Sequence, residues 1–257
     1  MKLQGKTALI AGGGGGIGRA VALALAHEGA KTAVADIVKD NAEKVSGEVK
    51  ALGVDAIACQ VDLTRKADVD RMVNEVLARF GQIDILVNCQ GWDRLEPFVE
   101  SHEETWEKLL AINFKSVLYT AKAVLPQMIS HGGGKIVNIS SDAGRVGSSW
   151  EAVYAGAKGA VIAFSKTIAR EVARYKINVN VVCPGLTETP LLQAVRSHRN
   201  KPRKLSKRSP RRHPFGVRRN PKKLPKRCCS SPLPLRSLSP DKPSVSAADS
   251  RWCEENN

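Results

Sequence analysis

The pattern of apolar and polar residues predicts alternating strands and helices over residues 1–195. Short apolar runs closed by Gly, Asp or Asn predict strands at 6–11, 31–36, 55–60, 83–88, 134–140 and 178–183. Longer stretches with helical spacing predict helices at 16–28, 41–52, 66–79, 103–130 and 152–175. This alternation predicts an α/β fold, a Rossmann-like doubly wound parallel sheet with helices on both faces. Such sheets bind ligands at the carboxyl ends of their strands.

The first junction between a strand and a helix is rich in glycine. Residues 7–20 read TALIAGGGGGIGRA. Glycines allow the backbone to approach a pyrophosphate, and the first amides of the following helix face its negative charge. The five consecutive glycines fit two known spacings, G-x-G-x-x-G at Gly13, Gly15 and Gly18, or G-x-x-x-G-x-G at Gly12, Gly16 and Gly18.

An acidic residue closes the second apolar run. Asp36 lies eighteen residues after Gly18. A carboxylate there can accept both ribose hydroxyls of NAD and repels the 2′-phosphate of NADP. Arg19 and Lys39 are basic and close in sequence, which favours the opposite choice. We predict NAD as the cofactor.

The segment 136–158 carries candidate catalytic residues. Ser141 ends a predicted strand, and Tyr154 and Lys158 share one face of the next predicted helix. A neighbouring ammonium favours the ionised phenol, so we expect Lys158 to lower the pKa of Tyr154. Ser141 could hydrogen-bond the same reacting oxygen. The alternative is a surface helix with an ordinary Tyr and Lys, and the upstream glycine loop makes that alternative the weaker one.

With these motifs in place, residues 3–195 resemble the short-chain dehydrogenase/reductase family. Its glycine motif falls on Gly12, Gly16 and Gly18, which settles the spacing, although Ala11 replaces a usual Thr. Its N-N-A-G segment is matched at the ends only, by Asn88 and Gly91, and its P-G turn by Pro184-Gly185. The resemblance assigns catalysis to Asn113, Ser141, Tyr154 and Lys158.

The resemblance also implies a set of cofactor contacts. Asp62 would hydrogen-bond the adenine, although it could instead cap the helix at 66–79. Asn113 would form a helix bend that holds a water against Lys158. The implied cofactor-binding residues are Gly12, Gly16, Ile17, Gly18, Asp36, Asp62, Leu63, Asn88, Gly91, Tyr154, Lys158, Pro184, Gly185 and Thr187.

The substrate class also comes from resemblance. Residues 91–93, 141–149 and 151–155 are similar to 2-hydroxycyclohexanecarboxyl-CoA dehydrogenases, and 3-oxoacyl thioester reductases are the next nearest group. This implies interconversion of a secondary alcohol and a ketone on a hydroxyacyl-CoA. An NADP-dependent 3-oxoacyl thioester reductase is the alternative, and a sugar, steroid or simple alicyclic alcohol are other possible substrates. The substrate-pocket candidates are Trp92, Asp93, Asp142 and Arg145, of which Trp92 could equally pack the loop.

Charge divides the chain. The 257 residues have a formal net charge of +15, and residues 196–257 hold 18 of the 40 Lys and Arg but 4 of the 25 Asp and Glu. Nine of the 13 prolines also fall there, a composition typical of disorder. We therefore predict a catalytic domain at 1–195 and a basic tail at 196–257.

Two interpretations of the tail remain open. A frame change near residue 204 would explain its Arg, Pro, Ser and Cys content. A genuine basic arm could instead bind RNA, DNA or acidic membranes, with the domain as a non-catalytic NAD-binding protein. We favour the frame change, because a nucleic-acid-binding arm would have aromatic residues interleaved with its basic ones. The tail lacks that pattern, and Phe215 and Trp252 are its two aromatic residues.

The tail has consequences for activity. It offers no seventh strand, so we expect an unpaired sheet edge, impaired activity and doubtful assembly of the family's tetramer. Neither a signal peptide nor a membrane span is evident, and Cys59, Cys89 and Cys183 fit buried thiols without metal-ligand spacing. We predict a cytoplasmic enzyme without a metal.

Overall fold

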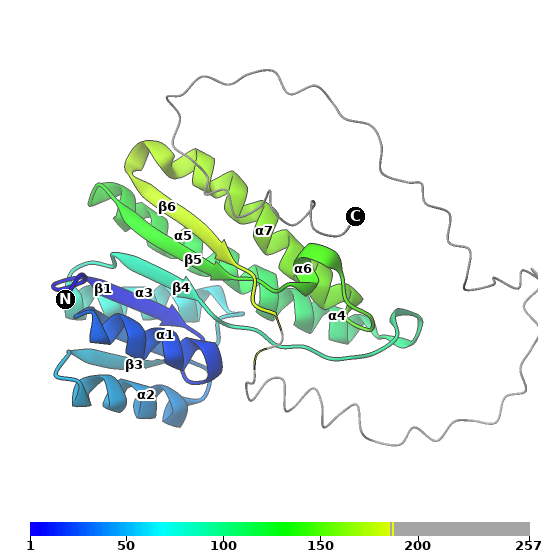
Figure 1. Ribbon diagram of the computed structural model, residues 1–257, viewed down its shortest axis with the longest axis horizontal. Coiled ribbons are helices and arrows are strands. Elements are labelled where there is room, and N and C mark those ends of the chain that lie inside the picture. Colours follow the sequence, from blue (N-terminus) through cyan, green and yellow to red (C-terminus); the bar gives the residue numbers. More distant parts are fainter. Residues whose placement is uncertain (186, 188–257) are drawn as a thin grey trace, which may run out of the picture. The chain divides into compact units, whose positions relative to one another are not determined.

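The computed structural model describes residues 1–185 and 187, which form one six-stranded parallel sheet (Figure 1). The strand order is β3-β2-β1-β4-β5-β6, with parallel pairing throughout. The strands are β1 (Thr7–Ala11), β2 (Lys31–Asp36), β3 (Ala56–Gln60), β4 (Ile85–Asn88), β5 (Gly134–Ile139) and β6 (Ile177–Val182). The predicted fold class and all six predicted strands are confirmed.

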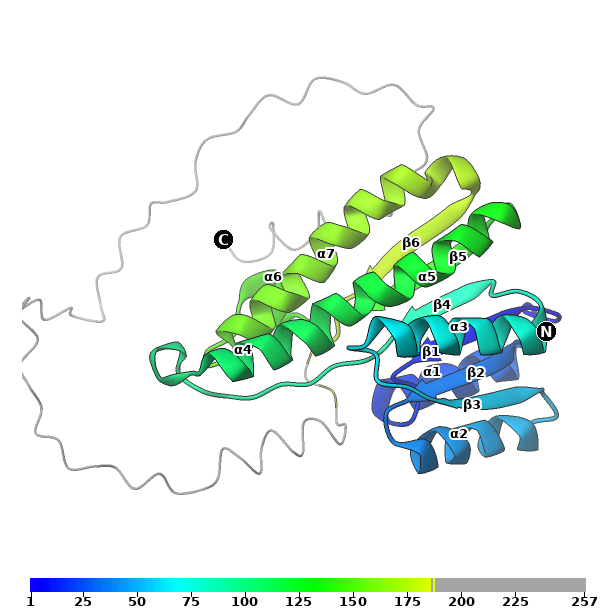
Figure 2. The same ribbon diagram turned by 180° about the vertical axis from the view of Figure 1, so that it is seen from behind.

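Helices cover both faces of the sheet. Helices α1 and α2 lie on one face, and α3, α5 and α7 lie on the other (Figures 1 and 2). The main helices are α1 (Gly16–His27), α2 (Lys39–Ala51), α3 (Lys66–Phe80), α4 (Glu103–Leu110), α5 (Ser116–Ser130) and α7 (Ala152–Val172). Short helical turns are η1 (Phe98–Glu100), α6 (Ala143–Val146) and η3 (Ala173–Tyr175). Of these, η1 and α6 are absent from the sequence-based prediction, because three or four residues carry too little periodicity to detect.

The core lies on both sides of the central strand β1. All five β1 residues are buried, with Leu9 in the cluster on one face and Ile10 in the cluster on the other. A strand buried on both faces needs a continuous apolar run rather than alternation, which is what TALIA provides. Because β1 is held on both faces, the glycine loop that follows it begins at a fixed position at the carboxyl end of the sheet.

The helix predicted at 103–130 contains a bend. Between α4 and α5, the residues Ala111–Lys115 form a π-helical turn, η2, and Asn113 inside it is buried. Its amide Nδ2 donates to the carbonyl oxygens of Leu109 and Trp92, and its Oδ1 accepts from the Trp92 amide at 3.2 Å. Asn113 thus fixes the loop after β4 to this bend.

A chain of hydrogen-bonded, buried polar side chains runs across two neighbouring strands and links them to two helices on the same face of the sheet. Thr120 on α5 donates to Asn88 on β4, Asn88 donates to Asn138 on β5, and Asn138 donates to Ser165 on α7, each at 2.8 Å. All four residues are at most 1% exposed. Because each buried polar group has a partner, the chain holds both helices on the sheet without a desolvation penalty.

Replacing Asn138 with Ala is expected to destabilise the protein by about 1–3 kcal/mol, because it leaves the buried Asn88 amide without its acceptor. The Ser165 hydroxyl loses the Asn138 donor but keeps its own bond to the carbonyl oxygen of Val161. Thermal unfolding of the variant measures the loss. Asn180→Ala on β6 is the matched control, since Asn180 is exposed. A melting temperature equal to that of the control would contradict the proposed role of the network.

Several sequence-based predictions fall on residues beyond this description. The boundary at 195/196, the absent seventh strand, the basic tail and its frame change all lie outside residues 1–185 and 187. Within the described part, β6 pairs with β5 on one side. In that same part, no helix is both long enough and apolar enough to cross a membrane.

Candidate active site

The glycine loop is tightly packed, and Gly12 and Gly18 leave the least room for a side chain. Gly12 has φ of 74°, and a Cβ there would lie 2.6 Å from the backbone nitrogen of Gln90. A Cβ on Gly18 would overlap the carbonyl oxygen of Gly12, whereas one on Gly15 would meet no atom within 4 Å. The packing agrees with the spacing Gly12, Gly16, Gly18, since Gly15 is free to carry a side chain.

Asp36 stands beside this loop at the end of β2. Its two carboxylate oxygens accept hydrogen bonds from the backbone amides of Gly14 and Val38, each at 3.0 Å. These bonds fix the carboxylate at the carboxyl end of the sheet, next to the N-terminus of α1. No side chain caps α1, so the amides of its first turn are available to an anion.

Besides the three glycines and Asp36, three further predicted cofactor contacts lie away from the cavity described below. Asp62 accepts from the amide and hydroxyl of Thr64, at 2.9 and 2.6 Å, in the turn that leads to α3. Leu63 beside it packs into the core. Asn88, expected on the ribose side, does not line the cavity, because its side chain is committed to the network across the sheet.

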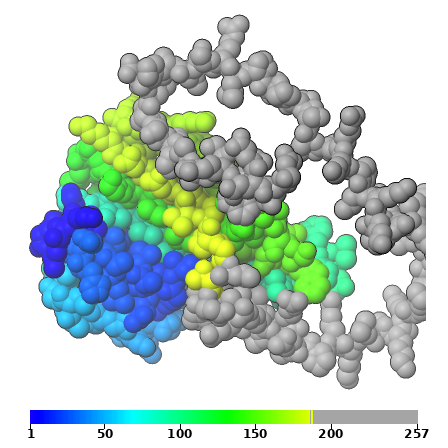
Figure 3. Space-filling model, viewed as in Figure 1, coloured from blue at the N-terminus to red at the C-terminus, as the bar shows by residue number. Residues whose placement is uncertain are grey.

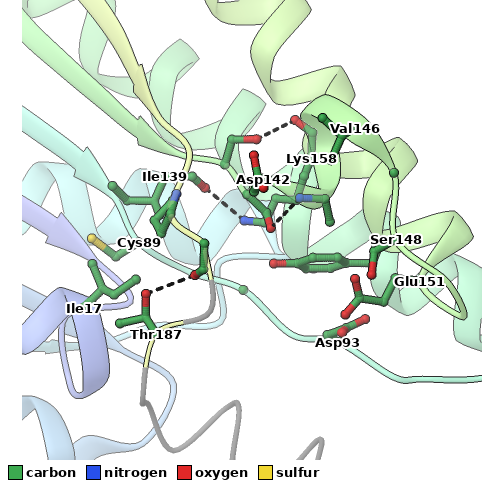
Figure 4. Close-up of a pocket in the computed structure, with 18 of the residues that line it drawn as sticks. Ile17, Cys89, Asp93, Ile139, Asp142, Val146, Ser148, Glu151, Lys158 and Thr187 are labelled. Carbon is green, nitrogen blue, oxygen red and sulfur yellow. Dashed lines mark hydrogen bonds between the residues drawn. The ribbon is translucent and has the colours of Figure 1, made fainter. Parts of the chain in front are cut away.

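A cavity of about 320 Å³ opens at the carboxyl ends of β4, β5 and β6 (Figure 4). Residues from the glycine loop, these strand ends and helices α6 and α7 form its wall. They are Ile17, Cys89, Gln90, Gly91, Asp93, Ile139, Ser140, Ser141, Asp142, Ala143, Val146, Gly147, Ser148, Glu151, Tyr154, Lys158, Pro184, Gly185 and Thr187. The structure therefore brings Ser141, Tyr154 and Lys158 together with the turn at Pro184-Gly185.

The last described residues complete this wall. The end of the described chain, in yellow, lies beside the blue N-terminal part of the molecule (Figure 3). Thr187 and Ile17 thus line one cavity although 170 positions separate them in the sequence. The Thr187 hydroxyl donates to the carbonyl oxygen of Gly185 at 3.1 Å.

Lys158 is buried at the base of the cavity. It is 3% exposed, and its Nζ donates to the carbonyl oxygen of Ile139 at 3.0 Å and approaches that of Gln90 at 3.5 Å. Burial lowers the pKa of Lys158 to about 8, although Cys89 and Asp93 oppose this shift. Lys158 therefore remains largely a cation at neutral pH, held by backbone carbonyls.

Tyr154 lies one turn before Lys158 on α7, with the Lys158 Nζ 5.9 Å from the centre of its ring. Burial raises the pKa of Tyr154 to about 12, Ser141 opposes the shift, and the carboxylates of Asp93 and Glu151 add to it. The expectation that Lys158 lowers this pKa is therefore wrong for the protein without a cofactor. The causes of the upward shift are burial and the two nearby acids, while the opposing contribution comes from Ser141 and not from Lys158.

The four predicted substrate residues divide into two groups. Asp93 and Asp142 line the cavity. Trp92 does not, because its ring packs under the Lys108 ammonium, 4.3 Å from the ring centre. Arg145, on the short helix α6, does not line the cavity either. Its guanidinium Nη1 lies 3.9 Å from Oδ1 of Asp142. Loop packing is thus the reading that the structure supports for Trp92.

Sequence reasoning missed several wall residues, of which Glu151 has the clearest consequence. Its carboxylate raises the pKa of Asp93, which burial has already moved upward, to about 7. A signal was present, because Glu151 immediately precedes the predicted helix and lies three positions before Tyr154. Cys89 also lines the cavity, and burial raises its thiol pKa to about 12, as expected for an unreactive thiol.

Comparison with known proteins agrees with the fold. The family model for short chain dehydrogenases matches residues 6–200. Sorbitol dehydrogenase from Cereibacter sphaeroides is 43% identical over 189 residues, which are 73% of each chain. The 3-oxoacyl-[acyl-carrier-protein] reductase FabG of Thermotoga maritima is 37% identical over 193 residues, 75% of this chain and 78% of that protein.

A solved structure is similar as well. The crystal structure of NAD⁺-bound xylitol dehydrogenase has a TM-score of 0.71 and 38% sequence identity, and the match covers 72% of each chain. The family resemblance seen in the sequence is thereby confirmed. The chain belongs to the short chain dehydrogenase family, and it is an oxidoreductase of the kind that interconverts alcohols and ketones.

Proposed function

We propose that this protein transfers hydride between NAD and a secondary alcohol or ketone, with Tyr154 as the acid–base residue. The observation that carries the proposal is the meeting of Ser141, Tyr154 and Lys158 in one cavity beside the glycine loop. When bound, NAD supplies the hydride acceptor, and the residues of the chain supply orientation and proton transfer.

The residues present fit a dinucleotide. The crowded contact between Gly12 and Gly18 lets the backbone come close to a pyrophosphate, and the uncapped N-terminus of α1 offers amide donors to it. Asp36 would accept the ribose hydroxyls, and Ile17, Gly91, Pro184, Gly185 and Thr187 would surround the nicotinamide end. Asp62 and Leu63 would contact the adenine.

Each catalytic residue has a distinct role in the proposal. Tyr154 accepts the hydroxyl proton during oxidation and returns it during reduction. Ser141 hydrogen-bonds the substrate oxygen and stabilises its developing charge. Lys158 would hydrogen-bond the nicotinamide ribose. With the positive charge of an oxidised nicotinamide bound nearby, its ammonium would favour the phenolate form of Tyr154. Asn113 positions the loop at Trp92 and anchors a water near Lys158.

Two substrate classes fit a secondary alcohol. A hydroxyacyl-CoA is our first candidate, from the resemblance at Trp92, at Ser141–Ser149 and at Glu151–Ala155, and the 3-oxoacyl reductases among the relatives favour a thioester. A polyol is the second, favoured by the 43% identity to a sorbitol dehydrogenase. Turnover of 2-hydroxycyclohexanecarboxyl-CoA, compared with sorbitol and xylitol, distinguishes the two, and failure on all three at saturating NAD would refute the proposed activity.

NADH is expected to bind more tightly than NADPH, because Asp36 would meet the 2′-phosphate with like charge. Asp36→Asn should bring the two dissociation constants within about tenfold of each other, mainly by tightening NADPH. Fluorescence titration of both cofactors measures this. Asp40→Asn, an exposed acid on α2, is the control and should leave the preference unchanged. Tighter NADPH than NADH binding by the native chain would reject the claim.

The setting of the enzyme completes the proposal. A reducing compartment such as the cytoplasm suits Cys59, Cys89 and Cys183, none of which forms a disulfide within the described part of the chain. A homo-oligomer, probed by light scattering, is expected for the family. Nucleic acid would bind through residues 196–257 alone, and salt-dependent DNA and RNA titration of the whole chain tests this.

A further inference from the structure

Two carboxyl groups from distant parts of the chain meet in the cavity wall. Asp93 comes from the loop after β4, and Glu151 immediately precedes α7 (Figure 4). The close-up places their carboxyl groups side by side, with Ser148 close to Glu151. Both carboxylates raise the pKa of the Tyr154 phenol, so the pair lies next to the proposed acid–base residue.

The charged surroundings of this pair are mainly acidic. Among the described wall residues, Asp93, Asp142 and Glu151 are acidic, and Lys158 is basic. The Lys158 ammonium points to backbone carbonyls at Ile139 and Gln90. Arg94 supplies its backbone amide to Asp93 at 2.7 Å, while its side chain pairs with Glu96 at 3.1 Å.

We propose that Asp93 and Glu151 form a specificity-determining wall, which accepts a neutral hydroxyl or thioester group beside the reacting carbon and rejects a carboxylate there. This rests on the proposed function, because it concerns the same cavity. A carboxylate of the substrate would lie against like charges in a partly desolvated site, which costs free energy. A hydroxyl can donate to either acid, and a thioester carbonyl can accept from a protonated one.

Protonation of Asp93 gives the wall a distinctive pH dependence. Because burial and Glu151 raise its pKa to about 7, Asp93 carries more negative charge at pH 8 than at pH 6. Rejection of an anionic ligand should therefore strengthen from pH 6 to pH 8. Lys158, whose pKa is about 8, also loses charge as the pH rises, so the contribution of Asp93 is the part of this change that Asp93→Asn removes.

The test uses two ligands with the same ring. Calorimetric dissociation constants of 1,2-cyclohexanediol and 2-hydroxycyclohexanecarboxylate are measured on the full chain saturated with NADH, at pH 6 and pH 8. We expect the native protein to prefer the diol, with a preference about tenfold larger at pH 8. Glu151→Gln and Asp93→Asn should each reduce the preference at pH 8 by about tenfold. Glu171→Gln, an exposed acid on α7, is the matched control and should match the native protein.

Outcomes for the wall and for the proposed activity are separable. An unchanged ratio in both folded variants, or no binding of the diol to the native chain, would overturn the wall, whether or not hydride transfer occurs. Retained discrimination without turnover of any alcohol would refute the proposed activity and leave the wall in place. Melting temperatures of the two variants establish that each is folded.

Discussion

Replacing Tyr154 with Phe is expected to lower kcat/KM by a factor of about 10²–10⁴ while the dissociation constant of NADH changes little. General acid–base catalysis by a positioned side chain contributes a factor of this size. The variant keeps the ring that packs near the Lys158 ammonium and removes the phenolic oxygen alone. Loss of activity would therefore report the missing proton carrier rather than a disturbed cavity.

Steady-state rates in both reaction directions and NADH titration on the same preparation measure this effect. Tyr175→Phe is the matched control, because Tyr175 packs against the core in η3 and lies outside the cavity wall described here. It should retain native rates. Activity of Tyr154→Phe within tenfold of native would mean that another group carries the proton.

Replacing Gly18 with Ala is expected to abolish measurable cofactor binding and to destabilise the protein by about 1–3 kcal/mol. The added methyl group would overlap the carbonyl oxygen of Gly12, and that backbone atom cannot move without disturbing Gln90 below it. Gly12 is itself confined by φ of 74° and by its approach to Gln90. The loop and the segment after β4 would therefore shift together.

Gly15→Ala is the control for this prediction, because a Cβ at Gly15 meets no atom within 4 Å and its φ of −169° suits any residue. Its free energy of unfolding should lie within about 0.5 kcal/mol of that of the native protein, as is usual for surface substitutions. Thermal unfolding and NADH titration of both variants provide the comparison. Equal losses in the two would show that crowding at Gly18 is not the cause.

Much of the fold could be predicted from the sequence. A short, continuous apolar run such as TALIA, with a polar residue before it and a glycine loop after it, indicates a buried parallel strand. The i, i+4 spacing of Tyr154 and Lys158 likewise predicted correctly that the two side chains lie one turn apart on a helix. The pKa of Tyr154 could not be predicted, because burial and the acids at Asp93 and Glu151 arise from tertiary contacts. Spacing alone suggested a nearby cation and gave the wrong direction.

The contact between Asp93 and Glu151 shows the same limit, since 58 positions separate them and no sequence period joins them. Asn88 is predicted from the family resemblance to lie on the ribose side, and that stays a prediction. Its side chain faces the buried network, a direction that the sequence does not reveal, because side chains alternate between the two sides of a strand. Strand ends indicate where a site lies, whereas side-chain direction decides which residues belong to it.

The polar chain through Asn88 and Asn138 also constrains how this sequence can change over time. Each member donates to the next, so altering one leaves its neighbour with an unmet hydrogen bond inside the core. Effects of paired substitutions within the chain should be strongly non-additive, because the second change removes a penalty created by the first. A single replacement within the chain is therefore costly, and an apolar replacement becomes tolerable when several of the four side chains are exchanged together.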